Sequence, residues 1–143
     1  MSLVDIYSAP EAARVLYDLL AERKPDQSIS HKQMPSFEEH CAFVASRPYQ
    51  AWYLIEAGDA EHEPPATVGA IYLTRPPANE IGIFIFRRYH RRGYAGEAIR
   101  ALIEQHGAQR YLANINPQNT DSIILFKRLG FRHIQNTYEL PAG

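Results

Sequence analysis

The sequence predicts an α/β (α+β) fold in which one mixed sheet is flanked by helices, within a single domain spanning residues 1–143. The length of 143 residues suits one hydrophobic core, and 45% hydrophobic with 22% charged residues is an ordinary globular mixture. Stretches with helical periodicity alternate with short apolar runs, which is the pattern of helices packed on a sheet. We expect the element order β-α-α-β-β-β-α-β-α-β, with one or two strands at the end.

The amino-terminal part predicts a strand followed by two helices. Residues 3–7 form a short apolar run that fits an edge strand. Ser8 and Glu11 match the S-x-x-E capping box, with apolar residues at helical spacing behind them. Ser36 and Glu39 repeat that pattern ahead of a second apolar stretch. Each pair therefore predicts the first turn of a helix.

Three consecutive apolar segments predict three strands. They are Ala51–Glu56, Thr67–Thr74 and Glu80–Phe86, and loops or turns rich in Gly, Pro and Asn separate them. The third reads EIGIFIF and is almost continuously apolar, so we expect a central strand that is buried on both faces.

The carboxy-terminal part alternates helices with short strands. A helix is expected from about Tyr94 to His106, a strand over Tyr111–Ile115 and a second helix over Thr120–Leu129. Gly130 suits a left-handed residue that ends this helix. Phe131–Leu140 is expected to form one or two final strands.

Composition and charge exclude several classes of protein. A net charge of −1 disfavours binding to nucleic acid or to an anionic membrane through bulk charge. The single cysteine excludes an intramolecular disulfide and a cysteine zinc cluster, and the six histidines lack ligand spacing, so we expect no metal. The chain has no apolar run of about 20 residues and no signal-peptide pattern at its start. The expected location is the cytoplasm.

One segment has the features of an anion site. After the strand that ends near Phe86 comes a turn with four arginines, and Gly93-Tyr94-Ala95-Gly96 then opens a helix. The first turn of a helix offers unpaired N–H groups and a partial positive charge, and small residues let a phosphate approach them. Neither G-x-x-x-x-G-K-[ST] nor G-x-G-x-x-G is present. The alternative is a solvated basic turn whose glycine only begins a helix.

Two motifs together resemble those of the GCN5-related N-acetyltransferase (GNAT) superfamily. The stretch Asn119–Phe131 resembles N-x-x-S-x-x-x-[YF]-x-x-x-G-F, and His90–Ala95 is similar to [QR]-x-x-G-x-[GA]. They occur in the order of the family, and the gap between them fits one helix and one strand. The resemblance covers residues 80–131 and implies a GNAT-like fold with acetyl-CoA as co-substrate.

The resemblance also implies where acetyl-CoA would bind. Its pyrophosphate would lie on backbone amides of the turn, at Arg91, Arg92, Gly93, Tyr94, Ala95 and Gly96. The pantetheine arm would run between two parallel strands that separate, Ile83–Phe86 and Tyr111–Ile115. A backbone N–H at Phe84, Ile85 or Phe86 would polarise the thioester carbonyl. Asn119 would hydrogen-bond the arm, and Ser122 would contact the cofactor; Asn119 also suits the N-cap of the last helix.

The implied chemistry is direct attack of a neutral primary amine on the thioester in a ternary complex. Glu80 is the candidate base, since the family often uses a glutamate on this strand; the alternative is a solvated residue at the strand end. His90 replaces the usual Gln or Arg. Phe126 replaces a tyrosine that is proposed to protonate the thiolate, so Phe126 is expected only to pack against the cofactor or the core.

The resemblance leaves the acceptor open. A small-molecule amine such as an amino sugar is the first expectation, and a ribosomal-protein-type N-terminal acetyltransferase is the alternative. A non-catalytic acyl-CoA-binding domain and a nucleic-acid module that uses residues 87–92 are less favoured. His31 and His40 lie in the region where the family builds its acceptor site, although a polar surface role is preferred for both.

Overall fold

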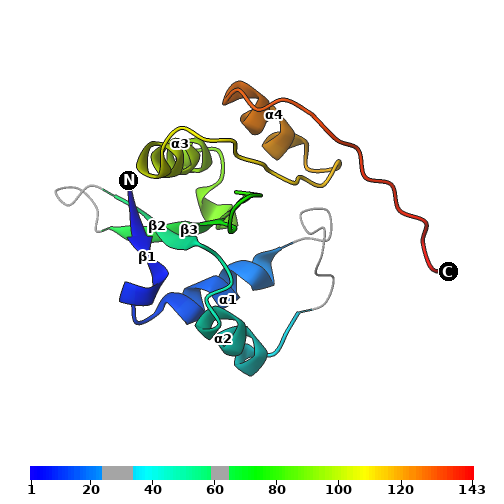
Figure 1. Cartoon of the computed structure of the whole chain (residues 1–143). Coiled ribbons are helices and arrows are strands. Elements are labelled where there is room, and N and C mark those ends of the chain that lie inside the picture. The colour runs from blue at the N-terminus through cyan, green and yellow to red at the C-terminus, as the bar shows by residue number, and fades with distance from the viewer. Residues whose placement is uncertain (24–33, 59–64) are drawn as a thin grey trace.

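The computed structural model describes residues 1–23, 34–58 and 65–143, and its centre is a four-stranded antiparallel sheet. The strands lie in chain order: β1 (Ser2–Asp5), β2 (Ala51–Ala57), β3 (Ala66–Leu73) and β4 (Ile81–Ile85). The main helices are α1 (Ala12–Glu22), α2 (Phe37–Ala45), α3 (Tyr94–His106) and α4 (Thr120–Arg128). Two short 3₁₀ turns, η1 (Ile6–Ser8) and η3 (Arg87–Tyr89), follow β1 and β4. Helices α1 and α2 cover one face of the sheet, and α3 covers the other (Figure 1).

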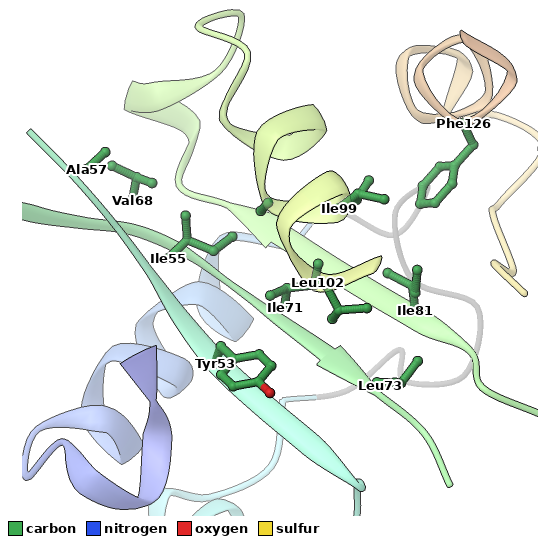
Figure 2. Packing of buried hydrophobic residues seen from close by; sticks show 11 residues of the cluster. Tyr53, Ile55, Ala57, Val68, Ile71, Leu73, Ile81, Ile99, Leu102 and Phe126 are labelled. Atoms are coloured by element: carbon green, nitrogen blue, oxygen red, sulfur yellow. The ribbon is translucent and has the colours of Figure 1, made fainter. Parts of the chain in front are cut away.

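The core is divided into two layers because alternate residues of each strand point to opposite faces. On the α3 face, Ile55 and Ile71 of the sheet pack with Ile99 and Leu102 of α3, and all four side chains are fully buried (Figure 2). Burying such a side chain contributes about 1.5–3 kcal/mol, so this layer holds α3 firmly on the sheet. That attachment fixes the position of the first turn of α3.

The second layer holds α1 and α2 against the opposite face. Leu16 and Leu19 of α1 and Val44 of α2 pack with Trp52 and Leu54 of β2. This packing brings the carboxy-terminal end of α1 over β4. The predicted helices and the first three strands are therefore confirmed, with bounds that shift by a few residues.

We expected β4 to be a central strand that is buried on both faces, and this prediction was wrong. It is the last strand of the sheet, and residues 82–85 are only half-buried. Its far edge meets the next segment at one isolated parallel bridge, between Glu80 and Leu112. The continuous apolar sequence of β4 therefore lines an open edge.

Two predicted strands are not formed. Beyond Leu112, residues 113–115 diverge from β4 without further pairing, so the strand expected over Tyr111–Ile115 is reduced to the bridge. The strands expected over Phe131–Leu140 are replaced by an extended segment with exposed side chains, which leads away from α4 in Figure 1. The chain thus ends its regular structure with α4. Gly130 has a φ of 97°, as the predicted helix stop requires.

Only one of the two predicted capping boxes is present. Ser36 Oγ accepts from Glu39 N–H at 3.1 Å, and the Glu39 carboxylate accepts from Ser36 N–H at 3.3 Å. Ser8 Oγ instead donates to the carbonyl of Asp5, while Glu11 occupies the N-cap position of α1 without a side-chain bond. The first prediction was wrong because the Asp5 carboxylate accepts from Tyr7 N–H and starts η1 one turn earlier.

Candidate functional site

A cleft of about 970 Å³ lies along the open edge of β4. One wall is β4 itself, the second is the turn and first residues of α3, and the third is the segment 113–122 that leads into α4. The cleft exists because residues 113–115 separate from β4 after the bridge at Leu112. A volume of this size is at the upper end of small-molecule sites.

The backbone of β4 presents hydrogen-bonding groups to this cleft. Antiparallel pairing directs the polar groups of alternate residues to opposite edges. Phe86 N–H donates to Val68 O on β3 at 2.8 Å, whereas Ile81 N–H donates to Leu112 O across the open edge at 2.8 Å. By the same alternation, the N–H groups of Ile83 and Ile85 face the cleft. His90 Nε2 lies 2.8 Å from Ile85 O on that edge.

This alternation corrects the set of amides expected from the sequence. Of Phe84, Ile85 and Phe86, only Ile85 directs its N–H to the open edge, because the other two residues pair with β3. Phe86 cannot polarise a ligand, since its N–H is bonded to Val68 O. Ile83 was expected beside the pantetheine arm but not as an N–H donor, although the two-residue period of the strand pairs it with Ile85.

The first turn of α3 supplies a second set of unpaired donors. Gly93 has a φ of 83° and is the N-cap, and the first helical bond runs from Glu97 N–H to Gly93 O at 3.1 Å. In the described chain, the N–H groups of Tyr94, Ala95 and Gly96 have no backbone acceptor, and all three residues line the cleft. Helix starts of this kind bind anions.

The arginines of the turn have different surroundings. Arg91 lines the cleft and has a φ of 64°. Arg92 does not line it, and its guanidinium lies over the ring of Tyr89 at 5.6 Å. Arg87 N–H donates to the Glu22 carboxylate at 2.8 Å and so joins the turn to α1. Arg91 is therefore the arginine of the predicted phosphate set that the fold brings to the cleft.

The α4 wall contains the predicted residues of the second motif. Asn119 is the N-cap of α4, where its Oδ1 accepts from Ser122 N–H at 3.3 Å. Its Nδ2 has no hydrogen-bond partner within the described residues. Phe126 is buried, lines the cleft and packs edge-on against Phe131 at 5.0 Å. Phe126 also belongs to the core on the α3 face (Figure 2).

Glu80 lies at the end of the cleft where β4 and residue 112 meet. Its N–H donates to Thr74 Oγ1 at 2.8 Å, and its carbonyl accepts from Thr74 N–H at 2.9 Å. The adjacent Asn79 accepts from Leu112 N–H at 3.0 Å through its carbonyl. These bonds fix the backbone of Glu80, and its carboxylate lines the cleft.

Two tyrosines, Tyr72 and Tyr49, lie on the same face of the sheet as Glu80, at the same end of the cleft. Tyr72 lies opposite Gly82, and a Cβ at that glycine would overlap its ring. The ring of Tyr49 stacks on Tyr72 with centroids 3.9 Å apart and an angle of 4° between the planes. Burial raises the pKa of Tyr72, and the nearby Glu80 carboxylate raises it further. Both phenols therefore remain neutral at physiological pH.

Tyr72 was not singled out from the sequence, and the two histidines of the acceptor region were. The sequence feature that could have indicated Tyr72 is Gly82, a glycine within the apolar strand β4 that lies opposite it. His40 is buried away from the cleft, with Nε2 at 3.2 Å from Ala13 O. His31 lies outside the described residues.

Two features of the described residues bear on other classes of function. They contain no group of three His, Cys, Asp or Glu side chains arranged to hold a metal ion. Within the same residues, every helix is too short or too polar to cross a membrane.

Comparisons with known proteins identify the family. The family model for the acetyltransferase (GNAT) domain matches residues 2–132. No curated protein matches the chain in sequence. Among solved structures, a domain from Methanocaldococcus jannaschii superposes with a TM-score of 0.81 at 20% identity, covering 96% of this chain and 92% of the other.

Two further structures share the fold at low identity. A chimera of Vibrio cholerae spermidine N-acetyltransferase has a TM-score of 0.70 at 16% identity, covering 94% of this chain and 84% of the other. A Salmonella typhimurium protein solved with its cofactor acetyl-CoA has a TM-score of 0.63 at 15% identity, covering 91% and 77%. The match of the family model over nearly the whole chain is the decisive finding: this chain belongs to the GNAT acetyltransferase family.

Proposed function

We propose that the protein is an acetyl-CoA-dependent N-acetyltransferase that acts on a primary amine of a small molecule. The observation that carries this proposal is the convergence of two donor sets on one cleft. The open edge of β4 supplies the N–H groups of Ile83 and Ile85, and the first turn of α3 supplies three more.

The residues of the cleft fit acetyl-CoA. The pyrophosphate would accept hydrogen bonds from the amides at Tyr94, Ala95 and Gly96, with Arg91 adding positive charge. The pantetheine amides would pair with the free edge of β4 as an additional strand does. Asn119 Nδ2 is a further donor on the opposite wall, and Ser122 lies beside it.

The same edge suits the chemistry of acetyl transfer. Acetyl-CoA supplies a thioester whose carbonyl oxygen gains negative charge when an amine attacks. An N–H group of Ile83 or Ile85, held rigid by the β3–β4 pairing, would stabilise that charge. The amine nitrogen bonds to the carbonyl carbon, the carbon–sulfur bond breaks and CoA leaves as its thiolate.

Glu80 is the proposed base for this step. It would accept a proton from the ammonium form of the acceptor, directly or through water, and so generate the neutral amine. Phe126 cannot protonate the thiolate, so the proton that sulfur finally takes comes from solvent or from the acceptor amine. The fixed backbone of Glu80 supports a positioned role for its carboxylate.

The acceptor is proposed to be a small amine, with an amino sugar as the first choice and a protein N-terminus as the alternative. Structures that share this fold include spermidine and aminoglycoside N-acetyltransferases, so small amines are acceptors elsewhere on this fold. A reducing compartment such as the cytoplasm suits the free thiol of Cys41.

Calorimetric titration with acetyl-CoA, followed by an amine panel, tests the proposal. Saturable micromolar binding and turnover of at least one amine are expected. Glu80→Gln is expected to retain acetyl-CoA affinity and to lower kcat by about 10²–10⁴-fold, the range for loss of a general base. The matched control is Glu104→Gln, which changes an exposed glutamate outside the cleft.

Two results would contradict the proposal in different ways. Failure to bind acetyl-CoA or CoA would show that the donors of β4 and α3 do not form a nucleotide site. Tight binding with no turnover of any small amine or amino-terminal peptide would instead support an acyl-CoA-binding domain without catalysis, which the missing tyrosine at Phe126 would explain.

A further inference from the structure

Arg23 is a cation inside the cleft that the proposed reaction does not use. It follows α1, where its N–H donates to Leu20 O at 3.2 Å, and its guanidinium lies 4.3 Å from the centre of the Phe84 ring. Its Nε is buried and has no hydrogen-bond partner. In the described chain, no carboxylate lies within ion-pair distance of it.

Arg23 is half-buried, so its guanidinium is partly removed from water. Desolvation lowers the pKa of its guanidinium, with the neighbouring phenols of Tyr72 and Tyr49 acting in the opposite direction. The carboxylate of the adjacent Glu22 is not within ion-pair distance of Arg23, and one of its oxygens accepts from Arg87 N–H. A partly desolvated cation whose Nε has no partner among the described residues carries a desolvation penalty, which an anionic ligand would offset.

The floor of the cleft around Arg23 has opposite charges at its two ends. Glu80, Gly82 and Phe84 point to one face of β4, and four residues of strand span about 13 Å. Glu80 marks one end, the Phe84 ring under Arg23 marks the other, and Tyr72 lies between them over Gly82. The floor therefore presents a carboxylate, an aromatic surface and a guanidinium in that order.

We propose that the acceptor is an amine that also carries an anionic group, a carboxylate or a phosphate, and that Arg23 binds this group while the amine lies toward Glu80. This inference rests on the proposed function and specifies its substrate class. A polyamine would place a second ammonium near the guanidinium of Arg23, and the repulsion would disfavour it. Arginine suits either anion because its planar guanidinium donates to two oxygens at once.

Matched pairs of amines that differ in the anionic group test the proposal. The pairs are 4-aminobutanoate with butylamine and glucosamine 6-phosphate with glucosamine, and spermidine serves as the polycation. Binding to the protein saturated with CoA is measured by calorimetry, and kcat and KM are measured with acetyl-CoA. The wild type is expected to prefer the anionic member of at least one pair, and the preferred pair distinguishes a carboxylate from a phosphate.

Substitution of Arg23 assigns the preference to this residue. Arg23→Gln is expected to weaken binding, and to raise KM, of the anionic amine by about 10–100-fold, the range for losing a charged hydrogen bond. Its partner without the anion should change little, and acetyl-CoA affinity should be unchanged. Arg23→Lys should recover part of the loss. Arg14→Gln is the control, because Arg14 is exposed on α1, where it pairs with Asp18 at 3.5 Å and lies over the Phe37 ring at 5.5 Å, outside the cleft.

The outcomes separate this proposal from the proposed function. Anion-dependent binding that is lost in Arg23→Gln supports the acceptor site even if no amine is turned over, in which case catalysis alone fails. Equal binding of both members of each pair, preference for spermidine or no binding of any anionic amine at millimolar concentration overturns it. A loss of acetyl-CoA affinity in Arg23→Gln also overturns it, because Arg23 would then serve the cofactor.

Discussion

The contact between Gly82 and Tyr72 shows how a single missing side chain shapes the cleft. Tyr72 occupies the space that a Cβ at Gly82 would fill, and its ring is held there by stacking on Tyr49 at 3.9 Å. Gly82→Ala is therefore expected to lower the free energy of unfolding by about 1–3 kcal/mol through overpacking, and to impair acceptor turnover. Urea denaturation and steady-state kinetics measure these effects.

A double-mutant cycle controls this prediction. In a Tyr72→Ala background, the ring that clashes is gone, so the further change Gly82→Ala should cost little. The two substitutions are then strongly non-additive, as expected for residues in contact. Equal costs of Gly82→Ala in both backgrounds would show that Tyr72 does not fill this space.

At the level of single residues, the residues of the cleft that the sequence predicted are those for which a motif or the family resemblance gave a reason. Asn119 and Phe126 of the second motif line the cleft, and so does Glu80, which the family resemblance implied. Tyr72 and Arg23 belong to no motif. Tyr72 reaches the cleft because β3 pairs with β4, and Arg23 reaches it because α1 packs across these two strands. Such positions depend on contacts between distant segments, which a single sequence does not show.

Among the elements, the starts of α1 and α2 make a matched test of local capping. Ser36→Ala removes a formed capping box and is expected to cost about 1 kcal/mol, which lowers Tm by a few degrees in a domain of this size. Ser8→Ala removes only an exposed bond to Asp5 O and should change stability by less than about 0.5 kcal/mol. Calorimetric scans compare the two; equal losses would contradict the assignment of the caps.

The contact between α2 and α1 predicts a pH dependence of stability. Burial lowers the pKa of His40 below its usual value of about 6.5, and the bond with Ala13 O opposes that effect only partly. Between the lowered pKa and about 6.5, the unfolded chain binds more protons at this residue than the folded chain does. The free energy of unfolding should therefore fall as the pH drops below about 6.5.

Substitution of His40 isolates its share of this dependence. His40→Gln keeps a donor for Ala13 O but does not titrate, so the loss of stability on acidification should become shallower. His133→Gln, which changes an exposed histidine, should leave the profile as it is in the wild type. Urea denaturation from pH 5 to 7.5 measures both, and identical profiles for the two variants would contradict the role of His40.

The elements that sequence predicted best are those whose signals are local. The second capping box and the apolar spacing of α3 concern residues within a few positions of one another. Residues 111–115 and 131–140 have strand-like composition, but a strand also needs a partner at its edge. Pairing at Leu112 ends after one bridge, so composition alone could not predict the open cleft beside β4.

At the scale of the whole molecule, the cleft is the place where strand pairing stops beside β4. The sheet and α3 share a dense core, and side chains of residues 111–115 pack against it, but in the described chain the backbone of this segment pairs with β4 at the Leu112 bridge alone. A ligand that pairs with the free edge of β4 would restore the missing connection between these parts. The same opening that admits a ligand therefore leaves backbone groups of residues 113–115 without hydrogen bonds in the described chain.

This arrangement predicts ligand-dependent protection from hydrogen exchange. In the free protein, the amides of Ala113, Asn114 and Ile115 should exchange quickly, because unpaired N–H groups exchange without any opening of structure. Saturation with acetyl-CoA should slow exchange on both walls of the cleft, at residues 113–115 and at Ile83 and Ile85. Exchange in β2, which is paired on both sides, should slow only to the extent that binding stabilises the whole fold, about 2.7 kcal/mol at a hundredfold excess over Kd. If calorimetry shows binding while both walls exchange as fast as in the free protein, the ligand does not occupy the edge of β4, and the donors of Ile83 and Ile85 have no part in the reaction.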